Sequence, residues 1–212
     1  MKHLLYLCIV LLCTACGKEA PLSPNVWVEI ACIATNSKGA PAYFIKDDGS
    51  RYTIAEIQKK QDIHAADSTY RVHCSYTKTG EDSIKVFAYA LVTSPVPQPT
   101  SFFPNGIKTA PVHIEAIWKS GDYINMILYP MIKEQKHVFH FVEQQLTLQE
   151  NNRKHLSFLL YHDNKEDTEA YRKKHVLSLP LSPYKSILKQ GDTVSITIQT
   201  YKEGLSTYTF VY

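Results

Sequence analysis

The stretch VHIEAIWKSGDYINMILY, residues 112–129, contains two apolar runs separated by the polar segment Ser120-Gly121-Asp122. Both runs are rich in β-branched and aromatic residues, which is typical of β-strands. Glycine between the runs accepts the positive φ that a tight turn needs. The stretch therefore predicts a β-hairpin, with strands at residues 112–118 and 123–129.

Downstream of this hairpin, every periodic segment is again strand-like. The segments are residues 138–148, 155–161, 175–181, 193–201 and 206–212. Seven strands in about 100 residues have the spacing of an immunoglobulin-like β-sandwich. The cysteine pair of antibody domains is absent, so we predict a general sandwich over residues 112–212.

Upstream of the hairpin, a proline-rich segment interrupts the strand pattern. Residues 95–111 contain five prolines, at positions 95, 97, 99, 104 and 111. Proline cannot donate to a sheet ladder and is excluded from sheet interiors. We therefore predict a linker or a stiff extended crossing between two domains.

The N-terminal half, residues 25–94, carries five strand-like runs: residues 26–35, 41–46, 51–54, 70–76 and 83–92. Asp47-Asp48-Gly49 separates two of them and predicts a second hairpin turn. A polar segment at residues 54–61, with Ile54 and Ile57, predicts a short helix after the third strand. This order matches the five-stranded OB barrel, so the chain is expected to be all-β, an OB-like barrel followed by an immunoglobulin-like sandwich.

The first 15 residues have the features of a signal peptide. A basic start is followed by an apolar run at residues 4–12 and by Thr14 and Ala15. The run is about half the roughly 20 residues that a transmembrane helix needs. We expect these residues to be removed on export.

Cys16 follows directly, and small residues before a cysteine resemble a bacterial lipobox, in which lipid is attached to the cysteine thiol. We predict a lipid anchor on Cys16 and a flexible tether over residues 16–24. Several acyl chains on one cysteine would anchor the protein stably. The alternative is an ordinary secretory cut after Ala15 or Ala20, which would release a soluble protein.

Charge and cysteine content limit the possible partners and bonds. The formal net charge is +3, and removal of Lys2 leaves about +2, too little for a nucleic-acid partner. After Cys16 the only cysteines are Cys32 and Cys74. They could form a disulfide outside the cytoplasm, worth roughly 3 to 4 kcal/mol for a loop of about 40 residues. The alternative is two separate buried thiols.

Six segments of the chain carry a family resemblance: YFIKDDG at residues 43–49, IWKSGDYIN at 117–125, HFV at 140–142, LLYHD at 159–163, LSPY at 181–184 and YTFVY at 208–212. They resemble the NigD-like lipoproteins of Bacteroidetes, and the Trp-x-x-Gly-Asp-Tyr element is the distinctive one. The resemblance spans nearly the whole mature chain. It implies a lipoprotein with an OB-like domain before a β-sandwich, and it implies no enzymatic activity or site.

Trp118, Asp122 and Tyr123 are the candidate ligand-contact residues, since an aromatic pair around a turn could stack on a sugar. Turn geometry is the alternative explanation: Asp122 can bond its own backbone, and the two rings can pack across the hairpin. The chain has no HExxH, no CxxC after the signal, no Gly-x-Ser-x-Gly elbow and no glycine-rich phosphate loop. We therefore predict no catalytic, cofactor-binding or metal-binding residues.

These features predict a non-enzymatic binding or protein-interaction module in the cell envelope, held at the outer membrane by its lipid, with the leaflet left open. The expected partners are the membrane and an envelope protein, peptide or glycan, and no nucleic acid. Two alternatives stay open. One is an envelope-structural or an inhibitor- or immunity-type protein, and the other is a hydrolase with a deep site of convergent residues.

Overall fold

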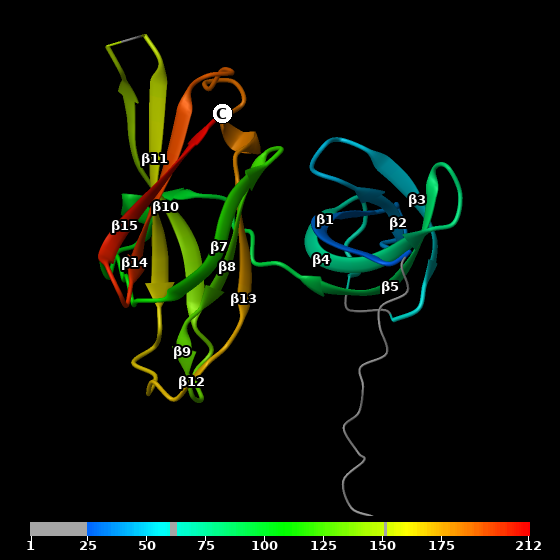
Figure 1. Ribbon diagram of the computed structural model, residues 1–212, viewed down its shortest axis with the longest axis horizontal. Coiled ribbons are helices and arrows are strands. Elements are labelled where there is room, and N and C mark those ends of the chain that lie inside the picture. The colour runs from blue at the N-terminus through cyan, green and yellow to red at the C-terminus, as the bar shows by residue number, and fades with distance from the viewer. Residues whose placement is uncertain (1–24, 60–62, 151) are drawn as a thin grey trace, which may run out of the picture.

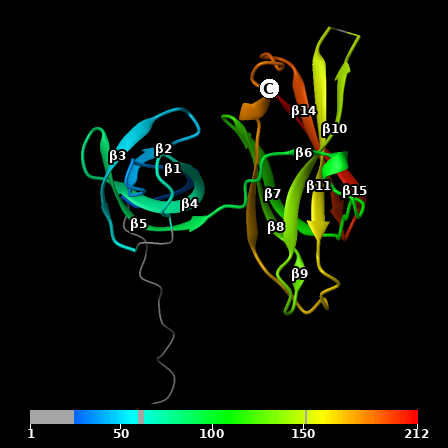
Figure 2. The same cartoon turned by 180° about the vertical axis from the view of Figure 1, so that it is seen from behind.

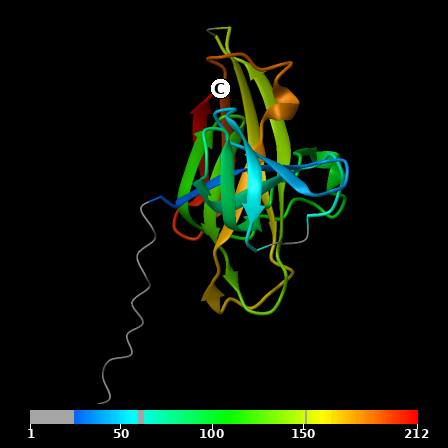
Figure 3. The same cartoon turned by 90° about the vertical axis from the view of Figure 1, so that its right-hand side faces the viewer.

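The computed structural model describes residues 25–59, 63–150 and 152–212, and it places them in a β-barrel and a β-sandwich that lie side by side (Figure 1). Cys16, the predicted signal peptide and the whole predicted tether, residues 16–24, lie outside the described residues. With the barrel in front, the sandwich extends beyond it at both ends (Figure 3). No helix in the described part of the chain is long and apolar enough to cross a membrane.

The barrel is closed, with strand order β1-β2-β3-β5-β4. Closure leaves no free edge, and the predicted OB-like barrel is confirmed. Its core is centred on Phe44 and Tyr76, whose ring centroids lie 4.7 Å apart. The strands are β1 (Trp27–Thr35), β2 (Pro41–Ile45), β3 (Arg51–Ile57), β4 (Thr69–Lys78) and β5 (Ser83–Leu91).

The helix predicted at residues 54–61 is wrong where the structure describes this segment. Strand β3 runs on to Ile57 and pairs in parallel with β5, and a bulge interrupts the register between Ile54 and Glu56. The extra residue of a bulge shifts side-chain alternation by one position. Both isoleucines therefore pack against the barrel core although they are three residues apart, and this spacing imitates a helix.

The sandwich packs a five-stranded sheet, ordered β15-β14-β11-β10-β6, against a three-stranded sheet, ordered β13-β8-β7. Seven long strands lie near the predicted segments, so the predicted β-sandwich is confirmed. Phe141, Phe158, Leu128 and Leu177 are fully buried in the core between the sheets. The strands are β6 (Gln98–Pro99), β7 (His113–Ser120), β8 (Tyr123–Tyr129), β9 (Met131–Ile132), β10 (Val138–Leu148), β11 (Lys154–Asp163), β12 (Tyr171–Arg172), β13 (His175–Pro180), β14 (Thr193–Thr200) and β15 (Gly204–Val211), with a 3₁₀ turn, η2, at Ser182–Tyr184.

The proline-rich segment, predicted as a linker, runs along the sandwich (Figure 2). Its residues Gln98–Pro99 form β6, which pairs in parallel with β10 at the sheet edge, and a 3₁₀ turn, η1 (Thr100–Phe102), follows. Phe103 then stacks on Tyr161 at 4.7 Å. Proline is tolerated at this position because the outer side of an edge strand needs no donor.

Candidate binding site at the domain junction

The junction between the two domains is built around Arg71, in the middle of β4. Alternate residues of β4 point into the barrel, among them Val72 and Cys74, so Arg71 and His73 point outward. The sandwich covers this outer face, and Arg71 is only 6% exposed. An arginine buried in this way needs charge neutralisation and a partner for each of its donors.

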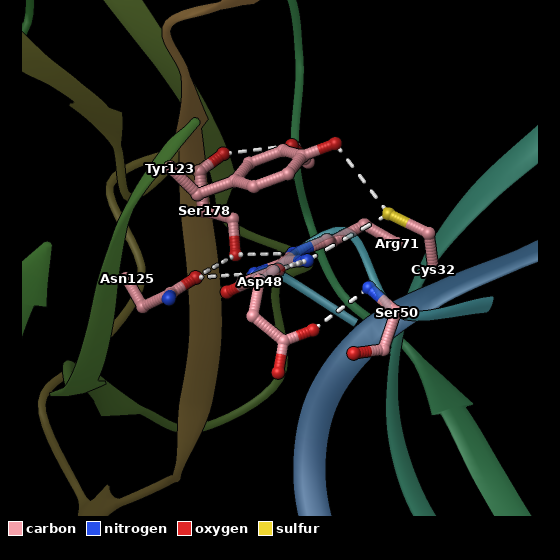
Figure 4. A network of polar contacts seen from close by, with 9 residues as sticks. Cys32, Asp48, Ser50, Arg71, Tyr123, Asn125 and Ser178 are labelled. Carbon is pink, nitrogen blue, oxygen red and sulfur yellow. Dashed lines mark hydrogen bonds and ion pairs between the residues drawn. The ribbon is translucent and has the colours of Figure 1, made fainter. Parts of the chain in front are cut away.

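Four polar side chains surround the Arg71 guanidinium (Figure 4). Within the barrel, both terminal nitrogens donate to the Asp47 carboxylate, with Nη2 at 2.8 Å from Oδ2. Across the junction, Nη2 donates to Asn125 Oδ1 at 3.0 Å, and Nε donates to Ser178 Oγ at 3.2 Å. Nη1 also lies 3.6 Å from Cys32 Sγ. One side chain therefore joins β2–β3 of the barrel to β8 and β13 of the sandwich.

The Tyr123 ring closes the remaining face of this network. Cζ of Arg71 lies 3.7 Å from the ring centroid, a cation–π contact, and the Tyr123 hydroxyl lies 3.4 Å from Cys32 Sγ. Burial raises the pKa of the Tyr123 phenol, and the neighbouring Cys32 adds to the rise. Burial alone would lower the pKa of Arg71, but the Asp47 carboxylate raises it above its usual value. Arg71 therefore stays charged.

The predicted hairpin turn lies directly against the barrel at Gly121. Its φ is +51°, and a Cβ there would lie 2.2 Å from the Asp47 carbonyl oxygen. Glycine is therefore required both by the turn and by the close approach of the two backbones. The same Asp47 residue thus contacts the sandwich through its backbone and neutralises Arg71 through its side chain.

The possible disulfide between Cys32 and Cys74 is not formed, and both cysteines are free and buried. Cys32 is paired with Arg71 in the β1–β4 ladder, whereas Cys74 is paired with Glu29, three residues further along each strand. An odd separation places the two thiols on opposite faces of the sheet. Cys32 faces the junction, while Cys74 lies in the barrel core, where burial raises its pKa to about 12.

A cavity of about 410 Å³ opens between the domains beside the Arg71 network. Val28, Lys46 and His73 line it from the barrel, and Trp118, Asn125 and Lys174 line it from the sandwich. Burial and the nearby Lys174 lower the pKa of His73, which favours the neutral ring. The volume falls within the range of small-molecule sites, and domain interfaces are a common place for them.

Asn125 links the cavity to the network. Its Oδ1 accepts from Arg71 and, at 2.6 Å, from Ser178 Oγ. Turning the amide over would aim its donors at the Arg71 donors, so the orientation is fixed by its partners. Nδ2 is left buried without a hydrogen-bond partner among the described residues. A buried donor of this kind needs an oxygen from water or from a ligand.

The three candidate residues of the hairpin point in different directions. Trp118 lines the junction cavity, Tyr123 covers Arg71, and Asp122 forms an ion pair with Lys185 at 2.6 Å. The structure therefore brings only Trp118 to the cavity. Sequence reasoning missed Arg71, Asn125 and Ser178.

A second buried polar group lies elsewhere in the sandwich. His137 Nδ1 is 2.9 Å from His162 Nε2, and His162 Nδ1 donates to the Ala110 carbonyl at 2.7 Å. Burial lowers the pKa of His162 to about 4, so this ring is neutral at pH 7. The structure shows no cluster of three or more metal-ligating side chains in the ranges that it describes.

Comparison with known proteins matches the sandwich to a protein family and the fold of the whole chain to solved structures. The family model for the NigD-like C-terminal beta sandwich domain matches residues 94–212. The whole fold is similar to that of a NigD-like immunity protein from Bacteroides caccae, with a TM-score of 0.71 and 24% identity over 87% of this chain and 97% of that one. No curated protein matches the sequence.

Two further solved structures share the fold. A protein from Parabacteroides distasonis, provisionally described as toxin-related, has a TM-score of 0.65 and 16% identity over 88% of this chain and 93% of its own. A protein from Bacteroides fragilis, provisionally described as a lipoprotein, has a TM-score of 0.54 and 16% identity over 89% of this chain and 96% of its own. At these identities, the structural similarity shows a common fold alone.

Proposed function

This chain belongs to the NigD-like family, and on that basis we propose that it is a lipid-anchored protein of the cell envelope that binds a partner at its domain junction without catalysing a reaction. The cavity between barrel and sandwich is the observation that carries the proposal. A cavity of this size takes one side chain of a partner protein or peptide, or one ring of a glycan. Trp118 supplies the flat apolar surface for it.

The charges around the cavity support a binding role over a catalytic one. Among the described residues, Lys46 lies 3.6 Å from Glu29 and 3.9 Å from Asp48, and Asp47 is held by Arg71. Hydrogen bonds from Ser50 and the nearby Lys46 lower the pKa of Asp48, and a carboxylate with a lowered pKa is a poor general base. The cavity therefore offers hydrogen bonds and an aromatic face.

The anchor is proposed at Cys16, with the outer membrane as its location. The small residues before Cys16 and the provisional description of the Bacteroides fragilis relative as a lipoprotein support it. Cys16→Ser is expected to abolish incorporation of a labelled fatty acid, because the thiol that carries the lipid is lost. Full labelling of Cys16→Ser in intact cells would contradict the anchor, and Cys13→Ser serves as the control that keeps its label.

Trp118→Ala is expected to abolish partner retention, since it removes the aromatic wall of the cavity. The measurement is affinity capture from intact envelopes followed by mass spectrometry, with wild-type, Trp118→Ala and Trp27→Ala proteins side by side. Trp27 is the matched control, because it is 58% exposed on the barrel. A partner held equally by all three proteins would place the binding site elsewhere, and the absence of any partner would refute the binding role.

An inhibitor- or immunity-type role is the second candidate, and the similarity to the Bacteroides caccae immunity protein supports it. This role predicts one protein in a stable stoichiometric complex, whereas glycan binding predicts a carbohydrate in the captured material. The same capture experiment therefore separates the two.

A further inference from the structure

Strand β15 forms one edge of the five-stranded sheet, with β14 as its single neighbour in the described part of the chain. It lies on the side of the sandwich away from the barrel in both opposite views (Figures 1 and 2). The strand is eight residues long, and every second side chain is exposed, with Leu205 at 62% and Val211 at 66%. An edge of this length presents a row of backbone groups that can pair with another strand.

Proteins usually protect such an edge with charged residues, with proline, by keeping the strand short or by covering it, and the edge strands β6, β7 and β13 follow this rule. Strand β7 carries Glu115 and Lys119, and β6 is two residues long and contains Pro99. Strand β13 ends at Pro180 and is covered in part by a bridge from Thr93 to Leu177. Strand β15, with the sequence GLSTYTFV, has no charge and no proline.

The hydrogen bonds at the end of β15 show which backbone groups face outward. Tyr212 N–H donates to the Asp192 carbonyl at 2.8 Å, toward the β14 side. Because backbone groups alternate along a strand, Phe210, Tyr208 and Ser206 bond toward β14. The free groups therefore belong to Leu205, Thr207, Thr209 and Val211, the same residues whose side chains are exposed.

We propose that this edge pairs with β15 of a second copy of the chain. An antiparallel pair centred on Tyr208 would place Thr207 opposite Thr209 of the second copy and Leu205 opposite Val211 of the second copy. All four outward-facing residues would then take part, giving about eight backbone hydrogen bonds. The facing pairs are hydroxyl with hydroxyl and aliphatic with aliphatic, both favourable across strands.

Because β15 carries no charged residue, β15 of a second copy is a suitable partner strand for it. An antiparallel self-pair sets the central residue of the strand opposite itself, so a charge there would face a like charge. Strand β15 has no charged residue and avoids this repulsion. The pairing would also leave both junction cavities open, because β15 lies on the far side of the sandwich from the barrel. Pairing of the edges and binding at the junction are therefore independent of each other.

Cysteine cross-linking in intact membranes tests the pair and its register. Two differently tagged full-length copies, one with Thr207→Cys and the other with Thr209→Cys, are produced together and oxidised. Opposed residues in a hydrogen-bonded pair lie about 5.5 Å apart, within disulfide range. We expect a reducible dimer that carries both tags, at about ten times or more the yield of the control.

The control is Thr197→Cys with Gln199→Cys, on the same sheet face one strand further in. Equal yields from edge and control would overturn the proposal, and so would a cross-link to a different protein. In detergent, wild-type protein is expected to sediment as a dimer and Thr207→Lys/Thr209→Lys as a monomer with an unchanged circular dichroism spectrum, which shows that the fold is kept. A wild-type monomer, or a lysine variant that remains dimeric, would equally overturn it.

Discussion

Arg71→Met is expected to lower the free energy of unfolding by about 3 to 5 kcal/mol, the cost of leaving one member of a buried ion pair without its partner. The variant leaves Asp47, whose side chain is 10% exposed, without its cation. It also removes the two hydrogen bonds that Arg71 donates across the junction, to Asn125 Oδ1 and to Ser178 Oγ. Urea denaturation followed by circular dichroism measures the loss.

Arg51→Met is the matched control for this prediction. Arg51 also lies over a tyrosine ring, with Cζ 3.6 Å from the Tyr43 centroid, but it is exposed. A surface contact of this kind contributes at most about 1 kcal/mol. Equal losses in the free energy of unfolding for the two variants would show that burial of Arg71 at the junction does not increase its contribution to stability. Arg71→Met combined with Asp47→Leu is expected to recover part of the loss, because both charges are then absent.

Gly121→Ala is expected to cost about 2 to 5 kcal/mol and to separate the hairpin from the barrel. The positive φ accounts for about 1 to 2 kcal/mol, and the remainder comes from the overlap of the new Cβ with the Asp47 carbonyl, which is backbone and cannot turn away. The readouts are urea denaturation and limited proteolysis of the junction.

Gly204→Ala separates the two contributions to this cost. Gly204 has a φ of +70°, and a Cβ added there would meet no atom within 4 Å outside its own chain neighbours. Only the backbone strain remains, so the loss should be about 1 to 2 kcal/mol. Gly121→Ala should therefore be the more harmful variant. If Gly121→Ala lowers the free energy of unfolding no more than Gly204→Ala does, the hairpin does not contact the barrel closely.

The strands could be predicted from sequence because alternation and turn residues are local signals. The hairpin at residues 112–129 and the Asp-Gly turn at residues 47–49 both have glycine between apolar runs, and the structure forms both turns. The failure at residues 54–61 is equally local. A bulge placed Ile54 and Ile57 on one face, and no pattern in a single sequence distinguishes that spacing from a helical one.

The junction could not be predicted, because its residues are ordinary in their own strands. Arg71 occupies an outward-facing position of β4, where an exposed charge is normal, and only the sandwich buries it. Asn125 and Ser178 likewise interrupt apolar strands without any sign of what they bind. The disulfide was undecidable for the same reason, since the face of each cysteine depends on a register that sequence does not give.

We expect Arg71 to couple the barrel and the sandwich, so that the two domains unfold as one cooperative unit. The two tryptophans test this coupling directly. Trp27 lies in β1 of the barrel and Trp118 in β7 of the sandwich, so Trp118→Phe and Trp27→Phe variants report each domain separately by fluorescence during urea unfolding. We predict coincident midpoints with Arg71 present and two separate midpoints in Arg71→Met. Midpoints that differ already with Arg71 present, or that stay coincident without it, would contradict the claim.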